Sequence, residues 1–292
     1  MRFATYEHEG STKVGVVSGV ELIDLTTELG KPCADVMDLL ALGEQGLDVA
    51  RRVAMQADRR VSIDAVKILP PVLRPEKLLG VGMNYHSFIR GARQLGMPIP
   101  ENPIWFYRPS GCLLGCHGDI WLPRGATDLD YEVELAIVIG RECRDVSVSE
   151  AGAAIGGFTI GNDLTLRGRA SKSMVFAKSF DTHTPLGPLL VTPDEVGDPH
   201  QLAVRTWVNG ELRQDSSTSD MITNCYELIS EISTHCTLRP GDTILTGTPD
   251  GCGFFRNPPT ALMAGDLVRL EIERLGVMEN RVIEAPARHA FF

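Results

Sequence analysis

The 292-residue chain lacks several features that mark particular classes of protein. No uninterrupted apolar stretch approaches the roughly 20 residues that a membrane-spanning helix needs. The first residues, Met1–Glu7, lead directly into strand-like sequence without the apolar segment of a secretory signal. Lysine and arginine number 28 against 38 acidic residues, and the formal charge of −10 disfavours nucleic acid and anionic membranes as partners. We therefore expect a soluble, cytoplasmic protein that binds neither.

Cysteine usage also argues against a disulfide framework. The seven cysteines are odd in number and scattered, which is typical of reduced thiols in a cytoplasmic protein. Cys112 and the neighbouring Cys116-His117 pair resemble soft-metal ligands at first sight. A second Cys/His pair with zinc-site spacing is missing, and the stretch is a glycine-containing loop, so small buried thiols are the better interpretation.

The overall composition is that of an ordinary globular protein. Hydrophobic residues make up 43% and charged residues 23% of the chain, and the length suits one large domain with a smaller one. Pro70, Pro71 and Pro75 interrupt the sequence, as they do at module boundaries. We predict a small N-terminal α+β domain over residues 1–72 and a larger, catalytic domain over residues 73–292.

Short strands separated by Gly/Pro turns dominate the pattern, which predicts a β-rich fold. In the front part we expect two helices and three strands: helices around Cys33–Leu42 and Leu47–Gln56, and strands Arg2–Tyr6, Lys13–Ser18 and Glu21–Asp24. Further strands are predicted at Leu78–Met83, Ile120–Leu122, Glu132–Ile139, Gly157–Asn162, Leu189–Val191, Leu202–Val208, Thr243–Thr246 and Leu267–Ile272. One helix, Met221–His235, has an apolar stripe and Ser219 or Asp220 as its N-cap. Asn209-Gly210 predicts a hairpin turn.

Two carboxylates stand two residues apart at the start of an apolar, β-branched strand. In a strand, Glu132 and Glu134 point to the same face, while the alternate residues face the core. Two like charges on such a strand are costly to desolvate without a cation, although an exposed face with two solvated glutamates is the alternative. Asp163 ends another strand. Three strand-end carboxylates suit a hard divalent cation such as Mg²⁺, Mn²⁺ or Ca²⁺.

Several motifs, in order, resemble one known family. The residues that carry the resemblance are Gly82-Met83-Asn84-Tyr85, Asp130-Tyr131-Glu132-Val133-Glu134-Leu135, Gly161-Asn162-Asp163-Leu164-Thr165-Leu166-Arg167, Ala177-Lys178-Ser179-Phe180-Asp181-Thr182, Pro185-Leu186-Gly187-Pro188, Val208-Asn209-Gly210-Glu211 and the stretch from Leu238 to Pro249. Over roughly residues 77–283 the chain is similar to the fumarylacetoacetate hydrolase superfamily. One of these motifs would be weak, but the ordered set is specific.

The resemblance implies a fold, a metal site and a substrate class. The fold is a β-rich α+β structure whose catalytic domain is a rolled β-sheet or barrel, with a small N-terminal domain, in a homodimer. The family's metal ligands correspond to Glu132, Glu134 and Asp163, with Mg²⁺ as the expected ion. Its active-site lysine corresponds to Lys178 and a substrate-contacting threonine to Thr248. The implied substrates are small 2-oxo acids and 1,3-dicarbonyls, which chelate a metal that acts as a Lewis acid.

For several other residues, a functional role and an ordinary structural or surface role are both possible. Tyr85 and Arg108 lie where the family binds substrate, and Arg108 could pair with a distal substrate carboxylate. The alternatives are a solvated loop arginine for Arg108, a surface lysine for Lys178 and a turn hydroxyl for Thr248. Arg167 and Arg169 either bind substrate or neutralise local carboxylates.

The chain departs from the family where hydrolytic members carry a His–Glu pair after Asn-Tyr. Counting forward from the motif places Phe88 and Gly91 at these positions, and counting back from Gly96 places Gly91 and Gln94 there. His86 is the nearest candidate base, displaced by two positions, and His183 is another nearby imidazole; a structural or surface role is the alternative for either.

Three functions remain open on this basis. The first is a metal-dependent hydrolase that cleaves a C–C bond of an acylpyruvate-like substrate. The second keeps the metal but needs no activated water: a decarboxylase, tautomerase or isomerase of a 2-oxo acid. The third is a ligand-binding homologue without turnover. Family membership favours the first, and the missing His–Glu pair counts against it.

Overall fold

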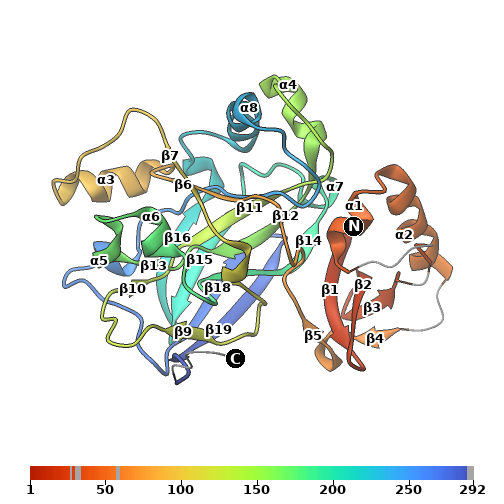
Figure 1. Ribbon diagram of the computed structural model, residues 1–292, viewed down its shortest axis with the longest axis horizontal. Coiled ribbons are helices and arrows are strands. Elements are labelled where there is room, and N and C mark those ends of the chain that lie inside the picture. The colour runs from red at the N-terminus through yellow and green to blue at the C-terminus, as the bar shows by residue number, and fades with distance from the viewer. Residues whose placement is uncertain (27, 30–33, 57–59, 288–292) are drawn as a thin grey trace.

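The computed structural model of the protein describes residues 1–292 except residues 27, 30–33, 57–59 and 288–292. Its strand-rich α+β fold confirms the predicted fold class (Figure 1). The front part contains β1 (Arg2–His8), β2 (Ser11–Ser18), β3 (Glu21–Asp24), α1 (Val36–Leu40), α2 (Glu44–Gln56), β4 (Val61–Ser62) and β5 (Lys67–Ile68). The first helix is shorter than expected, and Cys33, where it was predicted to begin, lies outside the described residues.

A mixed sheet runs through the whole protein. Its other strands are β6 (Leu78–Gly82), β7 (Ile104–Tyr107), β8 (Leu113–Leu114), β11 (Val133–Ile139), β12 (Ile155–Asn162), β14 (Thr184–Val191) and β17 (Thr243–Leu245). The main path follows the order β4-β3-β2-β1-β14-β12-β11-β17-β6-β7. Strand β1 pairs antiparallel with β14, with Arg2 opposite Val191. The front part is therefore joined to the rest by sheet hydrogen bonds, and the domain division at residue 72 stays a prediction.

A second sheet packs against the first. It has the order β16-β15-β18-β19-β9, with β9 (Ile120–Leu122), β15 (Ala203–Val208), β16 (Glu211–Ser217), β18 (Leu267–Ile272) and β19 (Gly276–Glu284). Strands β11 and β12 contact β15, β18 and β19, and the main hydrophobic core lies between them. The predicted hairpin turn has φ of 53° at Asn209 and 82° at Gly210. In the described residues neither strand order closes on itself, so the sheets are rolled rather than a closed barrel.

The helices are short and lie around the sheets (Figure 1). They are α3 (His86–Gln94), α4 (Val148–Ala151), α5 (Arg167–Ala170), α6 (Met174–Lys178), α7 (Pro193–Val196) and α8 (Cys225–His235), with 3₁₀ turns η1 (Ile63–Ala65), η2 (Ser110–Cys112), η3 (Gly152–Ala154), η4 (Thr218–Asp220) and η5 (Gly253–Phe255). A two-stranded ladder, β10 (Leu129–Asp130) with β13 (Thr165–Leu166), completes the list. None of the helices in the described residues could cross a bilayer.

The start of α8 was predicted too early. The expected caps Ser219 and Asp220 belong to η4, and the helix begins at Cys225 with Asn224 as its N-cap. The Asn224 side chain accepts hydrogen bonds from the backbone amides of Tyr226 and Glu227, and the Glu227 carboxylate accepts one from the Asn224 amide. This capping box satisfies the first-turn donors better than either predicted cap could.

Glu134 lies in strand β11, and Glu132 directly precedes that strand. The alternate residues Val133, Leu135, Ile137 and Ile139 face the main core as predicted, and Ala136 and Val138 are buried on the other face. Pairing with β12 sets Glu134 opposite Gly161, and the amide of Asp163 donates to the carbonyl of Glu132 at 2.9 Å. The sheet register therefore brings Asp163 beside the glutamate pair.

Candidate metal centre

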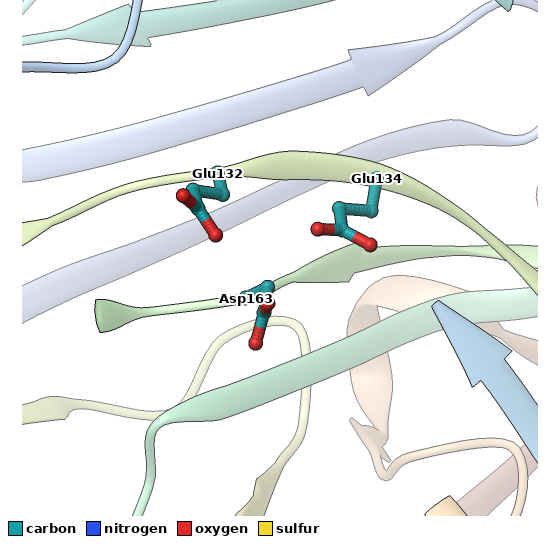
Figure 2. Close-up of side chains that lie close together, drawn as sticks. All are labelled: Glu132, Glu134 and Asp163. Atoms are coloured by element: carbon teal, nitrogen blue, oxygen red, sulfur yellow. The ribbon is translucent and has the colours of Figure 1, made fainter. Parts of the chain in front are cut away.

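Glu132, Glu134 and Asp163 come together as the sequence predicts. Each offers a carboxylate oxygen, and these oxygens lie within 4.8 Å of one another. Figure 2 shows the two glutamates extending from one ribbon and Asp163 from the adjacent one. All three side chains are buried, so the alternative of two solvated glutamates on an exposed face is wrong. Buried oxygens this close repel one another and require positive charge.

Lys178, at the end of α6, supplies one of these charges. Its ammonium donates to Glu132 Oε2 and Thr165 Oγ1, both at 2.8 Å, and to Asp163. It also lies 4.9 Å from the centre of the Phe106 ring. The residue is buried, which excludes a surface lysine. Burial lowers the pKa of Lys178, and the nearby arginines lower it further. The neighbouring carboxylates raise it, but by less.

Arg108 supplies a second charge from a fully buried position. Its guanidinium pairs with Asp163 and donates to the carbonyl oxygens of Lys178 and His183, the latter at 2.6 Å. Burial lowers its pKa to about 10, so it stays charged at neutral pH. Arg108 is therefore not a solvated loop residue. Its guanidinium is turned toward these internal partners, and its predicted role in substrate binding stays a prediction.

Arg167 is the third cation and connects two carboxylates. Its guanidinium lies 2.7 Å from Asp130 and 2.6 Å from Glu132. Burial opposes ionisation of Glu132, but Arg167 and Lys178 outweigh it and lower the pKa of Glu132 to about 2. Asp130 also accepts hydrogen bonds from the backbone amides of Gly253 at 2.7 Å and Phe254 at 3.1 Å. The arginine thus neutralises local carboxylates, one of the two roles considered for it.

Glu134 is the carboxylate of the cluster that forms no ion pair with any cation among the described residues. It accepts the Gly247 amide at 2.7 Å, while burial and the charge of Glu132 raise its pKa to about 8. Four buried carboxyl groups, with Asp130 included, face three cations in this region. A divalent cation would compensate Glu134 and leave a net positive charge for an anionic ligand. The residues present therefore fit the predicted metal.

The remaining predicted site residues are Tyr85, Thr248 and His86. Tyr85 is fully buried, and burial together with Glu134 raises the pKa of its hydroxyl well above the usual value. Thr248 accepts a hydrogen bond from the Gln214 side chain at 2.9 Å rather than from its own turn. His86 is an exposed residue at the start of α3. Their catalytic and substrate-binding roles stay predictions.

His183 is buried, and its ring forms its hydrogen bond with a backbone carbonyl outside the cluster. Its Nε2 lies 2.9 Å from the carbonyl of Trp121, and burial lowers the pKa of the imidazole to about 4. The two positions that correspond to the His–Glu pair in one register, Phe88 and Gly91, instead pack on Phe255, whose ring centre lies 4.7 Å from that of Phe88. Within the described part of the chain, the carboxylate cluster has lysine and arginine neighbours but no histidine.

Comparison with known proteins agrees with this geometry. The family described as "Fumarylacetoacetate (FAA) hydrolase C-terminal" matches residues 77–283. The chain belongs to this family. Its matched region includes every residue of the carboxylate cluster, and it is a family of enzymes, so catalysis on a small molecule is the general expectation.

Relatives of this fumarylacetoacetate hydrolase family member have different reactions in their names. "Oxaloacetate tautomerase FAHD2B, mitochondrial" of Bos taurus is 42% identical over 85% of this chain and 79% of its own. A maleylpyruvate hydrolase from Sphingobium sp. SYK-6, crystallised with manganese(II) and pyruvate, superposes with a TM-score of 0.84 at 31% identity, covering 98% and 100% of the two chains. A 2-hydroxyhepta-2,4-diene-1,7-dioate isomerase from Mycobacterium marinum gives 0.76 at 30% identity, covering 98% and 100%.

The names of these relatives leave the predicted hydrolysis and the predicted cytoplasmic location as predictions. A hydrolase, an isomerase and a tautomerase share the fold, so family membership alone does not select hydrolysis. The bovine relative is named as mitochondrial, and the cytoplasmic location expected for this chain stays a prediction. The homodimer and the identity of the metal as Mg²⁺ also stay predictions.

Sequence reasoning missed two parts of the centre. Asp130 was quoted only as part of a motif, yet it binds Arg167 and the η5 turn. The Gly247 amide that holds Glu134 comes from a loop 113 residues away in the chain. The position of Asp130, two residues before Glu132, could have indicated that it belongs to the same cluster. The Gly247 amide could not be predicted in this way, because every residue except proline has a backbone amide.

Proposed function

We propose that this family member is a divalent-metal-dependent tautomerase of a 2-oxo dicarboxylate. The reaction converts an enol to its ketone: one O–H bond breaks at the 2-position and one C–H bond forms at the adjacent carbon. The single observation that carries the proposal is the position of Lys178, a buried ammonium bonded to Glu132, Asp163 and Thr165. The 42% identity to a protein named as an oxaloacetate tautomerase supports it.

The residues of the cluster have distinct tasks in this proposal. Glu132, Glu134 and Asp163 would hold the metal, which supplies Lewis-acid polarisation of the 2-oxo group when bound. Lys178 holds a proton beside Glu132, and its lowered pKa makes that proton easier to transfer than one on a solvated lysine. Arg108 and Arg167 fix Asp163 and Glu132, so the carboxylates keep their orientation.

Hydrolysis of an acylpyruvate is the second candidate. It is favoured by the superposition of 98% of the chain on a maleylpyruvate hydrolase. Hydrolysis requires an activated water, which an imidazole–carboxylate pair usually provides. The exposed His86 and the inward-bonded His183 do not form such a pair with any described carboxylate near the cluster. Tautomerisation needs only proton transfer, which is why we place it first.

The experiment follows both reactions with one preparation. Protein loaded with Mg²⁺ or Mn²⁺ is mixed with enol-rich oxaloacetate and, separately, with an acylpyruvate, while the enol absorbance, pyruvate and CO₂ are measured. We expect metal-dependent loss of the oxaloacetate enol without stoichiometric CO₂, abolished by EDTA.

The other outcomes assign the alternatives. Release of pyruvate and a second acid from the acylpyruvate would replace the proposal with hydrolysis, and stoichiometric CO₂ from oxaloacetate would replace it with decarboxylation. Ligand binding without any turnover would identify a non-catalytic homologue.

A further inference from the structure

A single glutamine is buried on a strand whose other residues are exposed or partly exposed. Gln214 is fully buried in β16, and it is the one residue of that strand that is. Burying an amide side chain costs free energy unless the protein replaces the hydrogen bonds that it made with water. Gln214 has no part in the function proposed so far, yet one of its hydrogen bonds leads to Thr248, a predicted substrate contact.

The oxygen of the Gln214 amide accepts two hydrogen bonds. One comes from the backbone amide of Val133 at 3.2 Å, and the other comes from the hydroxyl of Thr206, directly opposite on β15, at 2.8 Å. Val133 stands between the two glutamates of the carboxylate cluster. Because a backbone N–H can only donate, this contact fixes which end of the side-chain amide faces the glutamates.

The nitrogen of the same amide faces the loop that follows β17. It donates to Thr248 Oγ1 at 2.9 Å and to the Pro249 carbonyl at 3.1 Å, and the Asp250 carbonyl lies 3.4 Å away. A carbonyl oxygen can only accept, so the partners on both sides of the amide require the same orientation of Gln214.

This orientation determines the direction of the Thr248 hydroxyl. Because Thr248 Oγ1 accepts a proton from Gln214, its own proton points away from Gln214, and the described residues contain no acceptor for it. Thr248 is buried and follows Gly247, whose amide donates to Glu134 at 2.7 Å. A buried donor of this kind, next to the carboxylate cluster, is available to an anion that enters the site.

The loop that carries Thr248 is held on both sides by the glutamate segment. Before Thr248, the Gly247 amide is bound to Glu134, and after it the Gly251 carbonyl accepts the hydroxyl of Tyr131 at 3.0 Å. With the backbone fixed in this way, the side chain that sets the direction of the Thr248 proton is Gln214.

We propose that Gln214 is a positioning residue for the 2-oxo acid. Its amide holds Thr248 so that the hydroxyl proton faces the metal centre and donates to the carboxylate of the bound substrate. This inference rests on the proposed function and on the predicted contact of Thr248 with substrate. A donor that is already oriented binds the anion without the cost of reorienting when the ligand arrives.

The test measures pyruvate binding, without turnover, by isothermal titration calorimetry on Mn²⁺-saturated protein. Gln214→Glu keeps the acceptor for Val133 and Thr206 but has no donor, so the Thr248 proton is drawn to the new carboxylate. We expect the dissociation constant of pyruvate to rise about tenfold. Gln214→Met removes the donor without adding charge and should have the same effect. The matched variant Gln201→Glu, at an exposed glutamine before β15, should bind pyruvate as the natural protein does.

A double-mutant cycle with Thr248 separates positioning from a general disturbance of the fold. Thr248→Val removes the hydroxyl and should itself weaken pyruvate binding about tenfold. Adding Gln214→Glu or Gln214→Met to it should cause no further loss, because the group through which Gln214 acts is gone. In Thr248→Ser, which keeps a hydroxyl, both changes at Gln214 should retain their full effect.

Two results overturn the role of Gln214 and leave the tautomerase proposal standing. One is unchanged pyruvate binding in both Gln214 variants or in Thr248→Val, and the other is a loss that persists in the Thr248→Val background. If neither Gln214 variant folds, Thr206→Val, which removes one of the two bonds to the amide oxygen, replaces them in the cycle with the same criterion. Failure of the natural, loaded protein to bind pyruvate overturns the proposed function, and the role of Gln214 with it.

Discussion

At the scale of single residues, side-chain type and spacing were enough to predict the metal-binding carboxylates. Glu134 lies in β11, Glu132 directly precedes that strand, and Asp163 directly follows β12, so the three carboxylates come together. Their charge partners were less accessible to prediction. Lys178 and Arg167 were recognised from motifs, but their bonds to Glu132 depend on two short helices whose position only the folded chain defines.

Glu134→Gln tests the metal centre with the smallest structural change. The substitution removes a ligand charge but keeps an acceptor for the Gly247 amide. Because burial raises the pKa of Glu134 to about 8, the metal-free protein already holds this side chain neutral at pH 7, and we expect little loss of stability. Calorimetric titration with Mn²⁺ should show an affinity lower by about a hundredfold or more, and turnover should fall with it.

The control is Glu284→Gln, at an exposed position of β19. It should bind Mn²⁺ as the natural protein does. Unchanged affinity in Glu134→Gln would remove Glu134 from the ligand set.

At the scale of elements, several strands were predicted close to their observed bounds, whereas β7, β16 and β19 were not predicted and β14 was predicted only over its last residues. Strand β3 has its predicted bounds, whereas β16 (Glu211–Ser217) was not predicted as a strand because only Gln214 in it is buried. The start of α8 was placed too early because Ser219 and Asp220 are good caps in isolation, and the competing 3₁₀ turn is set by tertiary contacts.

The η5 turn depends on a buried ion pair, which Asp130→Asn tests. Asp130 binds Arg167 through two nitrogens and accepts the Gly253 and Phe254 amides. Removing its charge leaves Arg167 short of a partner, and breaking a buried pair in this way costs about 3 kcal/mol of unfolding free energy. Urea denaturation measures it, with the exposed Asp119→Asn as the control. A loss below about 1 kcal/mol would mean that the pair behaves like a solvated one.

At the scale of the whole molecule, the buried charges make stability depend on pH and metal. The ordinary pKa of a glutamate is 4.5, and folding raises that of Glu134 to about 8 in the metal-free protein. Between these values the folded chain keeps a proton that the unfolded chain has released. Stability therefore falls as pH rises through this window.

Thermal unfolding in EDTA checks this dependence. The midpoint should be higher at about pH 5.5 than at about pH 8, and Glu134→Gln should flatten the difference because glutamine does not titrate. Added Mn²⁺ should reverse the trend, since the metal binds the deprotonated carboxylate. The same slope in Glu134→Gln as in the natural protein would assign the effect to other groups.

The pairing of β1 with β14 affects how the protein is made. The two strands meet at Arg2 and Val191, so β1 finds this partner only after the chain between them has been synthesised. Until then the edge of β1 at Arg2 and Phe3 is open, beyond the part that β5 covers, and a second nascent chain could pair there instead. Contacts so distant in sequence also slow folding. Productive synthesis of this protein therefore depends on keeping β1 shielded from other chains until β14 emerges.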